Sequence, residues 1–151
     1  MHSHIQLTLF LIKEHFFPVQ EAENHIAFYA TLTAHTTLGQ KQTIEFDHII
    51  TNIGNAYNGV SGVFTVPITG IYQFSTTMLQ YSSTTIHTQL MKNTISVGQN
   101  FGNSNRASAT QTVIVSAQKG DIVYVRHHEG IGSTQVIHGL GYSSFSGFLI
   151  S

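Results

Sequence analysis

The chain has 151 residues, of which 41% are hydrophobic and only 9% are Asp, Glu, Lys or Arg, and its formal net charge is −1. This length fits one domain with a hydrophobic core, and the hydrophobic content excludes an intrinsically disordered protein. Nucleic acid is not expected as a partner, because phosphate binding needs a concentrated cationic surface and the chain has six basic side chains. The absence of cysteine excludes a disulfide framework and a thiol nucleophile.

Residues 1–24 form an N-terminal segment of uncertain role, which we interpret as a leader or an extra strand. Its apolar stretch at 5–12 is interrupted by Gln6 and Thr8, and it lacks the basic start and small-residue cleavage site of a signal peptide. A strand or short helix that packs on the domain is favoured over a signal peptide. No run of 18 apolar residues is present, so no membrane-spanning helix is expected.

From residue 25 to residue 151 the sequence predicts β-strands in one domain. Runs of β-branched and aromatic residues alternate with Gly, Asn and Ser, which favour turns. Short strands with turn signals between them indicate a β-sandwich, a jelly roll or a barrel. The predicted strands cover 25–34, 62–67, 70–81, 85–97, 108–117, 121–129, 134–139 and 142–151.

Several predicted strands are apolar on both faces. In the C-terminal strand, Phe145 and Leu149 point to one face, and Phe148 and Ile150 point to the other, because side chains alternate along a strand. A sandwich strand needs only one apolar face, so the second face requires another layer or another subunit. The pattern therefore predicts an oligomer.

An ordered set of aromatic and small residues occupies positions 46–74. It consists of Phe46, Asn52, Tyr57, Phe64, Gly70, Tyr72 and Phe74, with five, four, six, five, one and one residues between them. This spacing resembles the signature of the C1q-like (complement globular-head) domain family. The signature usually closes with an aromatic residue where this chain has Thr76. Further resemblance to family strands lies at 27–33, 118–125 and 145–150.

The resemblance implies an all-β, ten-stranded jelly roll of the tumour-necrosis-factor-like architecture that assembles as a homotrimer. Family members are secreted, non-enzymatic recognition modules, and members without a collagen stalk are often lectin-like receptors of innate immunity. We therefore expect a secreted pattern-recognition protein that binds carbohydrate or microbial surface ligands. A histidine-mediated extracellular metal-binding protein and a structural trimerisation head remain alternatives.

The signature residues themselves are expected to be core and turn residues rather than a ligand site. Gly70 and Pro67 turn the chain between two strands, and Tyr72 and Phe74 share a face on which they can meet Phe64.

Two loops carry the polar groups that carbohydrate binding requires. Amides and hydroxyls pair with sugar hydroxyls, and an aromatic ring stacks on the apolar sugar face. Arg106 also suits a carboxylate or a phosphate. The alternative is that these Asn residues are present because turns require them. The candidates are Tyr57, Asn58, Asn103, Asn105 and Arg106.

Two places in the sequence are candidates for a metal site. Some family members bind calcium at the start of the strand that here begins Arg106-Ala107-Ser108, and the missing carboxylates make calcium doubtful. His127 and His128 point to opposite faces of their strand, so the pair cannot chelate one ion. Three copies of one of them around a threefold axis would suit zinc, nickel or copper, and would repel one another below about pH 6.

No catalytic constellation is recognisable, so an enzyme is not expected. The nucleophile motif Gly-x-Ser-x-Gly is absent. Of the seven acidic residues, Glu45 with Asp47 and Asp121 with Glu129 are interpreted as solvated turn residues rather than catalytic carboxylates.

Overall fold

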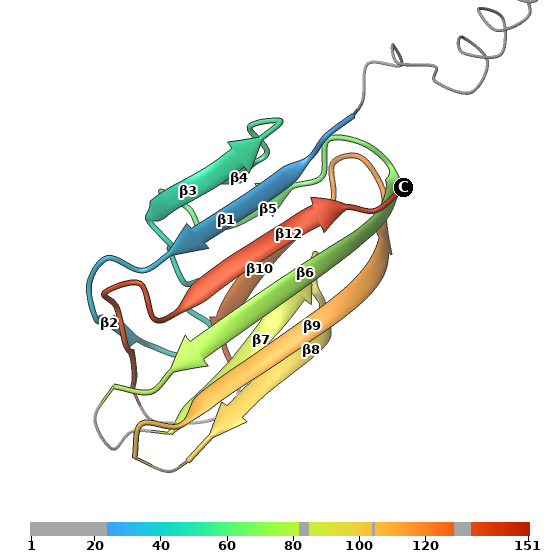
Figure 1. The fold of residues 1–151 in the computed structure, drawn as a ribbon. Helices are drawn as coiled ribbons and strands as arrows, with labels where there is room; N and C mark the ends of the chain where they lie inside the picture. The colour runs from blue at the N-terminus through green and yellow to red at the C-terminus, as the bar shows by residue number, and fades with distance from the viewer. Residues whose placement is uncertain (1–23, 82–84, 104, 129–133) are drawn as a thin grey trace, which may run out of the picture.

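The computed structural model describes residues 24–81, 85–103, 105–128 and 134–151, which fold as a β-sandwich. Two five-stranded sheets pack face to face, with the strand orders β3-β1-β12-β6-β9 and β4-β5-β10-β7-β8 (Figure 1). Strands β2 and β11 form a separate two-stranded sheet. The predicted ten-stranded jelly roll is confirmed. No helix among the described residues is long and apolar enough to cross a membrane.

The strands are β1 (Ala27–Thr31), β2 (Thr36–Leu38), β3 (His48–Ile53), β4 (Tyr57–Asn58), β5 (Val63–Thr65), β6 (Gly70–Leu79), β7 (Ile86–Lys92), β8 (Ile95–Gly102), β9 (Ser108–Ala117), β10 (Ile122–His127), β11 (Gln135–Ile137) and β12 (Ser144–Leu149).

The single strand predicted at 85–97 is wrong, because this run contains β7, a tight turn and the start of β8. Asn93 adopts a positive φ of 54° in the turn. Asn tolerates this left-handed conformation better than most residues. Its side-chain oxygen also accepts a hydrogen bond from Ile122 N–H at 3.0 Å, which fixes the turn against β10. The sequence run lacks the glycine that usually marks such a turn.

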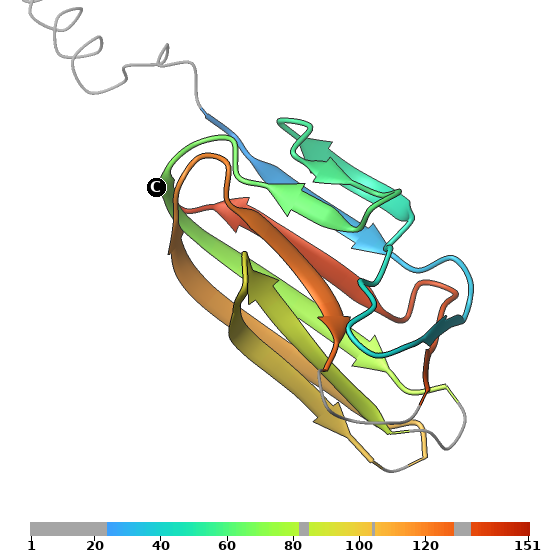
Figure 2. The same ribbon diagram turned by 180° about the vertical axis from the view of Figure 1, so that it is seen from behind.

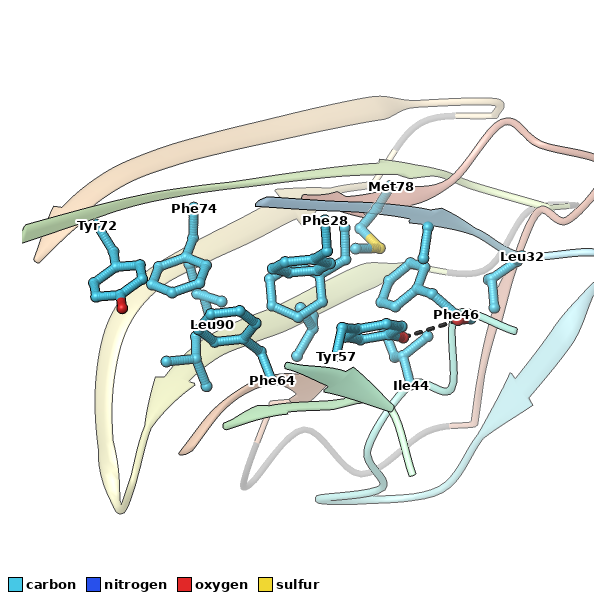
Figure 3. Packing of buried hydrophobic residues seen from close by; sticks show 14 of the residues in the cluster. Phe28, Leu32, Ile44, Phe46, Tyr57, Phe64, Tyr72, Phe74, Met78 and Leu90 are labelled. Atoms are coloured by element: carbon cyan, nitrogen blue, oxygen red, sulfur yellow. Dashed lines mark hydrogen bonds between the residues drawn. The ribbon is translucent and has the colours of Figure 1, made fainter. Parts of the chain in front are cut away.

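The core between the sheets is dominated by aromatic rings (Figure 3). Phe28 lies at its centre, stacked on Tyr57 at 4.8 Å and on Phe64 at 5.0 Å between ring centroids. The rings of Phe64, Tyr72 and Phe74 also contact one another, as the alternation of Tyr72 and Phe74 predicts. Residues from both sheets therefore share one aromatic cluster, whose large rings bury apolar area between the sheets.

Thr76, which stands where the family signature has an aromatic residue, is part of a polar contact inside the sandwich. It is buried, and its hydroxyl accepts a hydrogen bond at 2.8 Å from the side-chain amide of Asn100, which is also buried. Thr76 lies on β6 and Asn100 on β8, so the bond joins the two sheets. A specific polar pair thus replaces an aromatic contact at this position.

The two ends of the sandwich differ (Figures 1 and 2). Residue 24 and the C-terminus lie at one end, next to Gly70. A Cβ at Gly70 would overlap the carbonyl oxygen of Ser151, which explains the glycine at this signature position. We call the opposite end the loop end. It contains the segments that follow β1 and β6, the β8–β9 turn, and the connection from β11 to β12.

Candidate functional site

The signature residues contact one another and neighbouring strands within the fold. The Asn52 side chain donates to Tyr57 O at 2.9 Å and accepts from Tyr57 N–H at 3.2 Å, which ties β3 to β4. The Tyr57 hydroxyl donates to Phe46 O at 2.8 Å (Figure 3). Burial raises the pKa of the Tyr57 phenol, so this group stays neutral. The Tyr57 side chain is thus buried in the core, and its hydroxyl is hydrogen-bonded within the protein.

A hollow of about 660 Å³ lies beside β4 and includes Tyr57 and Asn58 in its lining. The Asn58 side-chain oxygen accepts hydrogen bonds from Val60 N–H at 2.8 Å and Ser61 N–H at 3.2 Å. This is a local side chain-to-backbone bond of the kind that stabilises turns. Lys119 also lines the hollow and is exposed.

The other three carbohydrate candidates, Asn103, Asn105 and Arg106, are exposed in the β8–β9 turn at the loop end. Arg106 has a positive φ of 58°. The turn is fixed to the end of β6, because Gln80 N–H donates to Ala107 O at 2.8 Å and the Gln80 side-chain oxygen accepts from Ala107 N–H. Strands β4 and β8 are the two edges of one sheet, so the two predicted loops do not form one site within a chain.

The two candidate metal ligands lie in different surroundings. His127 is 0% exposed and donates from Nδ1 to Gly39 O at 2.7 Å. His128 contacts His87, with ring centroids 3.9 Å apart. Within the described part of the chain, no group of three or more His, Cys, Asp or Glu side chains is placed to hold a metal ion. Because His127 points into the sandwich, it cannot reach copies of itself in an assembly.

His87 is expected to make the protein less stable in mild acid. Burial lowers the pKa of its imidazole; the hydrogen bond to Gln99 opposes this shift, and the His128 and His127 rings reinforce it. The unfolded chain, with an ordinary histidine pKa of about 6.5, therefore binds protons first. The contribution of neutral His87 to the free energy of unfolding is fully present above about pH 6.5. It is lost as the pH falls towards the lowered pKa of the folded protein.

Urea midpoints at pH 7.5 and pH 5.0 test this expectation. The fall in midpoint between the two pH values should be smaller in His87→Gln than in the unsubstituted chain. The same substitution at His48, which is exposed, serves as the control. An equal fall in the His87→Gln protein would show that this imidazole does not titrate in the expected range.

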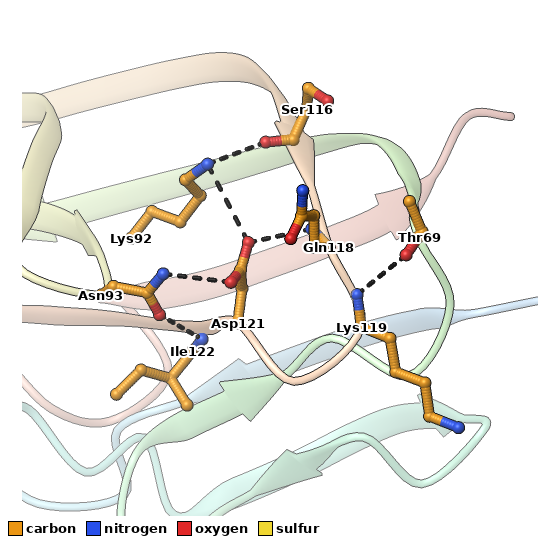
Figure 4. Close-up of polar contacts among 8 residues, drawn as sticks. All are labelled: Thr69, Lys92, Asn93, Ser116, Gln118, Lys119, Asp121 and Ile122. Atoms are coloured by element: carbon orange, nitrogen blue, oxygen red, sulfur yellow. Dashed lines mark hydrogen bonds and ion pairs between the residues drawn. The ribbon is translucent and has the colours of Figure 1, made fainter.

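Of the acidic candidates that the structure describes, Asp121 stabilises a turn and Asp47 joins two segments that are distant in the sequence. Asp121 accepts from Gln118 N–H at 2.9 Å and from the Asn93 side chain at 3.1 Å (Figure 4). These bonds hold the pKa of the half-buried Asp121 carboxyl below its usual value. Asp47 accepts from Thr33 N–H at 2.9 Å. Glu129 lies outside the described residues.

Sequence reasoning missed an exposed ring cluster at the loop end, formed by His35, Tyr81, His138 and Tyr142. The rings of His35 and Tyr81 stack at 3.8 Å, and His138 contacts His35 at 4.5 Å and Tyr142 at 4.8 Å. No short sequence pattern predicts the cluster, because its members come from three separate segments of the chain. We call it the tyrosine–histidine platform.

The outward face of the sheet β3-β1-β12-β6-β9 is apolar near the termini. One row across it contains Ile53, Ala27, Phe148, Gln73 and Ile114, in register on the five strands. The next row, through Tyr29, is mostly Ser and Thr. Both rows lack Asp, Glu, Lys and Arg. The exposed large apolar residues of this face are Tyr29, Ile53, Ile71, Ile114, Phe148 and Ile150.

Comparison with known proteins identifies the family. The model of the C1q domain matches residues 27–150. The chain belongs to the C1q domain family. Caprin-2 of Danio rerio is 33% identical over 147 residues, and the match covers 93% of this C1q domain chain. The chain spans only 15% of the length of that relative.

Solved structures show the same fold. The globular domain of zebrafish complement 1qA matches with a TM-score of 0.69 and 21% identity, over 85% of this chain and 98% of that one. Eiger TNF from S. frugiperda matches with a TM-score of 0.72 and 13% identity, over 84% and 93% of the two chains. Murine APRIL matches with a TM-score of 0.64 and 12% identity, over 84% and 100%.

Family membership agrees with the expected class of protein. C1q and TNF-like homologues are trimeric, and members of the family are generally non-enzymatic and commonly extracellular. The C1q domain is thus a recognition or trimerising module.

Proposed function

We propose that this C1q domain is a secreted, homotrimeric, non-catalytic recognition module that binds carbohydrate in a lectin-like manner. The observation that carries the trimeric assembly is the apolar outward face of the sheet β3-β1-β12-β6-β9. Such a face is costly to leave in water, and contiguous apolar patches usually mark an interface. The trimeric state of homologues supports a threefold assembly through this face.

Carbohydrate recognition is supported by the chemistry of the loop end. The exposed side chains of its β8–β9 turn include the neutral amides of Asn103 and Asn105, beside the guanidinium of Arg106. Amides suit sugar hydroxyls, and Arg106 suits a carboxylate on an acidic sugar. The loop end also lies away from both described ends of the chain (Figure 1), so it stays accessible when further domains are attached there.

Two measurements test the proposal. Sedimentation equilibrium should give a mass of about three times 16.6 kDa. A glycan array should show binding that weakens on Arg106→Ala or Asn105→Ala. Trimers that bind no glycan would support a structural trimerisation head instead. A monomer at all concentrations would contradict the trimer.

A further inference from the structure

The tyrosine–histidine platform presents aromatic rings and polar atoms together at the loop end. Tyr142 is 59% exposed and Tyr81 is 40% exposed. Each is in contact with His138, at centroid distances of 4.8 and 5.4 Å and interplanar angles of 77°. None of the four platform residues is an Asp, Glu, Lys or Arg. The platform therefore suits a neutral ligand that has both an apolar face and hydrogen-bonding groups.

Backbone hydrogen bonds hold the platform segments together before any ligand binds. Leu140 N–H donates to Thr33 O at 3.0 Å, His138 N–H to Leu79 O at 2.8 Å, and Tyr81 N–H to Val136 O at 3.1 Å. These bonds connect the segments after β1, after β6 and after β11. A preformed arrangement reduces the entropy that ligand binding would otherwise lose.

Gly139 brings two of these segments into close contact. A Cβ at this position would overlap the backbone of Ala34 and His35, so only glycine allows the approach. Its N–H donates to His35 Nδ1 at 3.0 Å, and its carbonyl oxygen lies 3.0 Å from His138 Nδ1. One residue therefore orients both imidazoles.

These two bonds assign opposite tautomers to the histidines. His35 Nδ1 accepts a hydrogen bond, so neutral His35 carries its proton on Nε2. A carbonyl oxygen only accepts, so His138 Nδ1 donates, and in the neutral imidazole Nε2 then carries a lone pair. The platform thus holds one donor and one acceptor nitrogen on rings whose centroids are 4.5 Å apart. A sugar hydroxyl both donates and accepts, and neighbouring hydroxyls match such a pair.

We propose that the tyrosine–histidine platform is a carbohydrate subsite that takes one neutral pyranose. The apolar face of the sugar stacks on Tyr142, and two hydroxyls meet His35 and His138. This rests on the proposed carbohydrate function and places the ligand at residues distinct from the predicted loop residues. Gln80, the residue before Tyr81, is bonded to Ala107 beside Arg106, so the subsite and the β8–β9 turn lie at neighbouring positions.

The test measures binding of defined sugars to the full chain by NMR titration. The probes are methyl α-mannopyranoside, methyl β-galactopyranoside and N-acetylglucosamine. Tyr142→Ala should weaken binding of the recognised probe by about tenfold or more, which corresponds to about 1.4 kcal/mol. Tyr142→Phe keeps the ring and should bind within about threefold of the unsubstituted chain.

His138→Ala removes the acceptor nitrogen and should also weaken binding by about tenfold. Phe101→Ala is the matched control, because Phe101 is an aromatic residue of nearly equal exposure (58%) outside the platform. Circular dichroism and the thermal midpoint establish that each variant is folded.

The outcomes separate this inference from the proposed function. If a glycan binds but Tyr142→Ala and His138→Ala bind it equally well, the platform proposal is wrong and carbohydrate recognition stands. If neither the probes nor a glycan array show binding, both proposals are wrong. If a peptide library binds and Tyr142→Ala abolishes that binding, the platform belongs to a protein partner, and the carbohydrate subsite is excluded.

Discussion

Ile114→Asp is expected to dissociate the proposed trimer into folded monomers of 16.6 kDa. Ile114 is 65% exposed on the apolar row of the sheet β3-β1-β12-β6-β9. In the assembly this side chain would lie against a neighbouring subunit. A carboxylate there would lose its hydration without gaining a partner of opposite charge, because the row contains no cation, and such burial costs several kcal/mol. Three equivalent interfaces multiply the effect.

Ile95→Asp is the matched control for this prediction. Ile95 is 62% exposed, nearly the same as Ile114, but it lies on β8 in the other sheet. The Ile95→Asp protein should keep the mass of the unsubstituted chain in sedimentation equilibrium. The interface is elsewhere if Ile114→Asp is folded by circular dichroism and keeps the trimer mass.

The local alternation of side chains made both faces of the sandwich predictable. Phe145 is buried and Phe148 is exposed, as a period of two residues requires. The same alternation places His127 inside the sandwich and His128 outside it. These features depend only on neighbours along one strand, so the sequence is sufficient to predict them.

Contacts between distant segments could not be predicted in this way. The Asn100 amide that bonds Thr76 lies on another sheet, and no local pattern shows that it compensates for the missing aromatic residue. The tyrosine–histidine platform depends on Gly139 approaching the backbone at Ala34, which is set by the packing of loops. Candidate sites chosen from Asn-rich turns therefore identified exposed loops but missed the ring cluster.

Phe28→Ala is expected to cause the largest loss of stability of any single substitution considered. Phe28 is 3% exposed, and its ring contacts Tyr57, Phe64, Phe74 and Phe145. Truncation removes the apolar side chain and leaves a cavity between the two sheets, so the free energy of unfolding should fall by about 3–5 kcal/mol. This is a large part of the roughly 5–15 kcal/mol that stabilises a typical domain.

A Phe→Ala substitution at an exposed site is the control for Phe28→Ala. It shows how much stability is lost when a phenylalanine is removed outside the core. Phe101→Ala makes the identical substitution at a 58% exposed position, where a change of less than about 1 kcal/mol is expected. Both proteins should be unfolded with urea at one protein concentration, because association of subunits adds to the apparent stability. Equal losses in the two variants would mean that the ring of Phe28 does not organise the core. A much larger loss for Phe28→Ala would show that packing of this ring against rings from both sheets stabilises the sandwich.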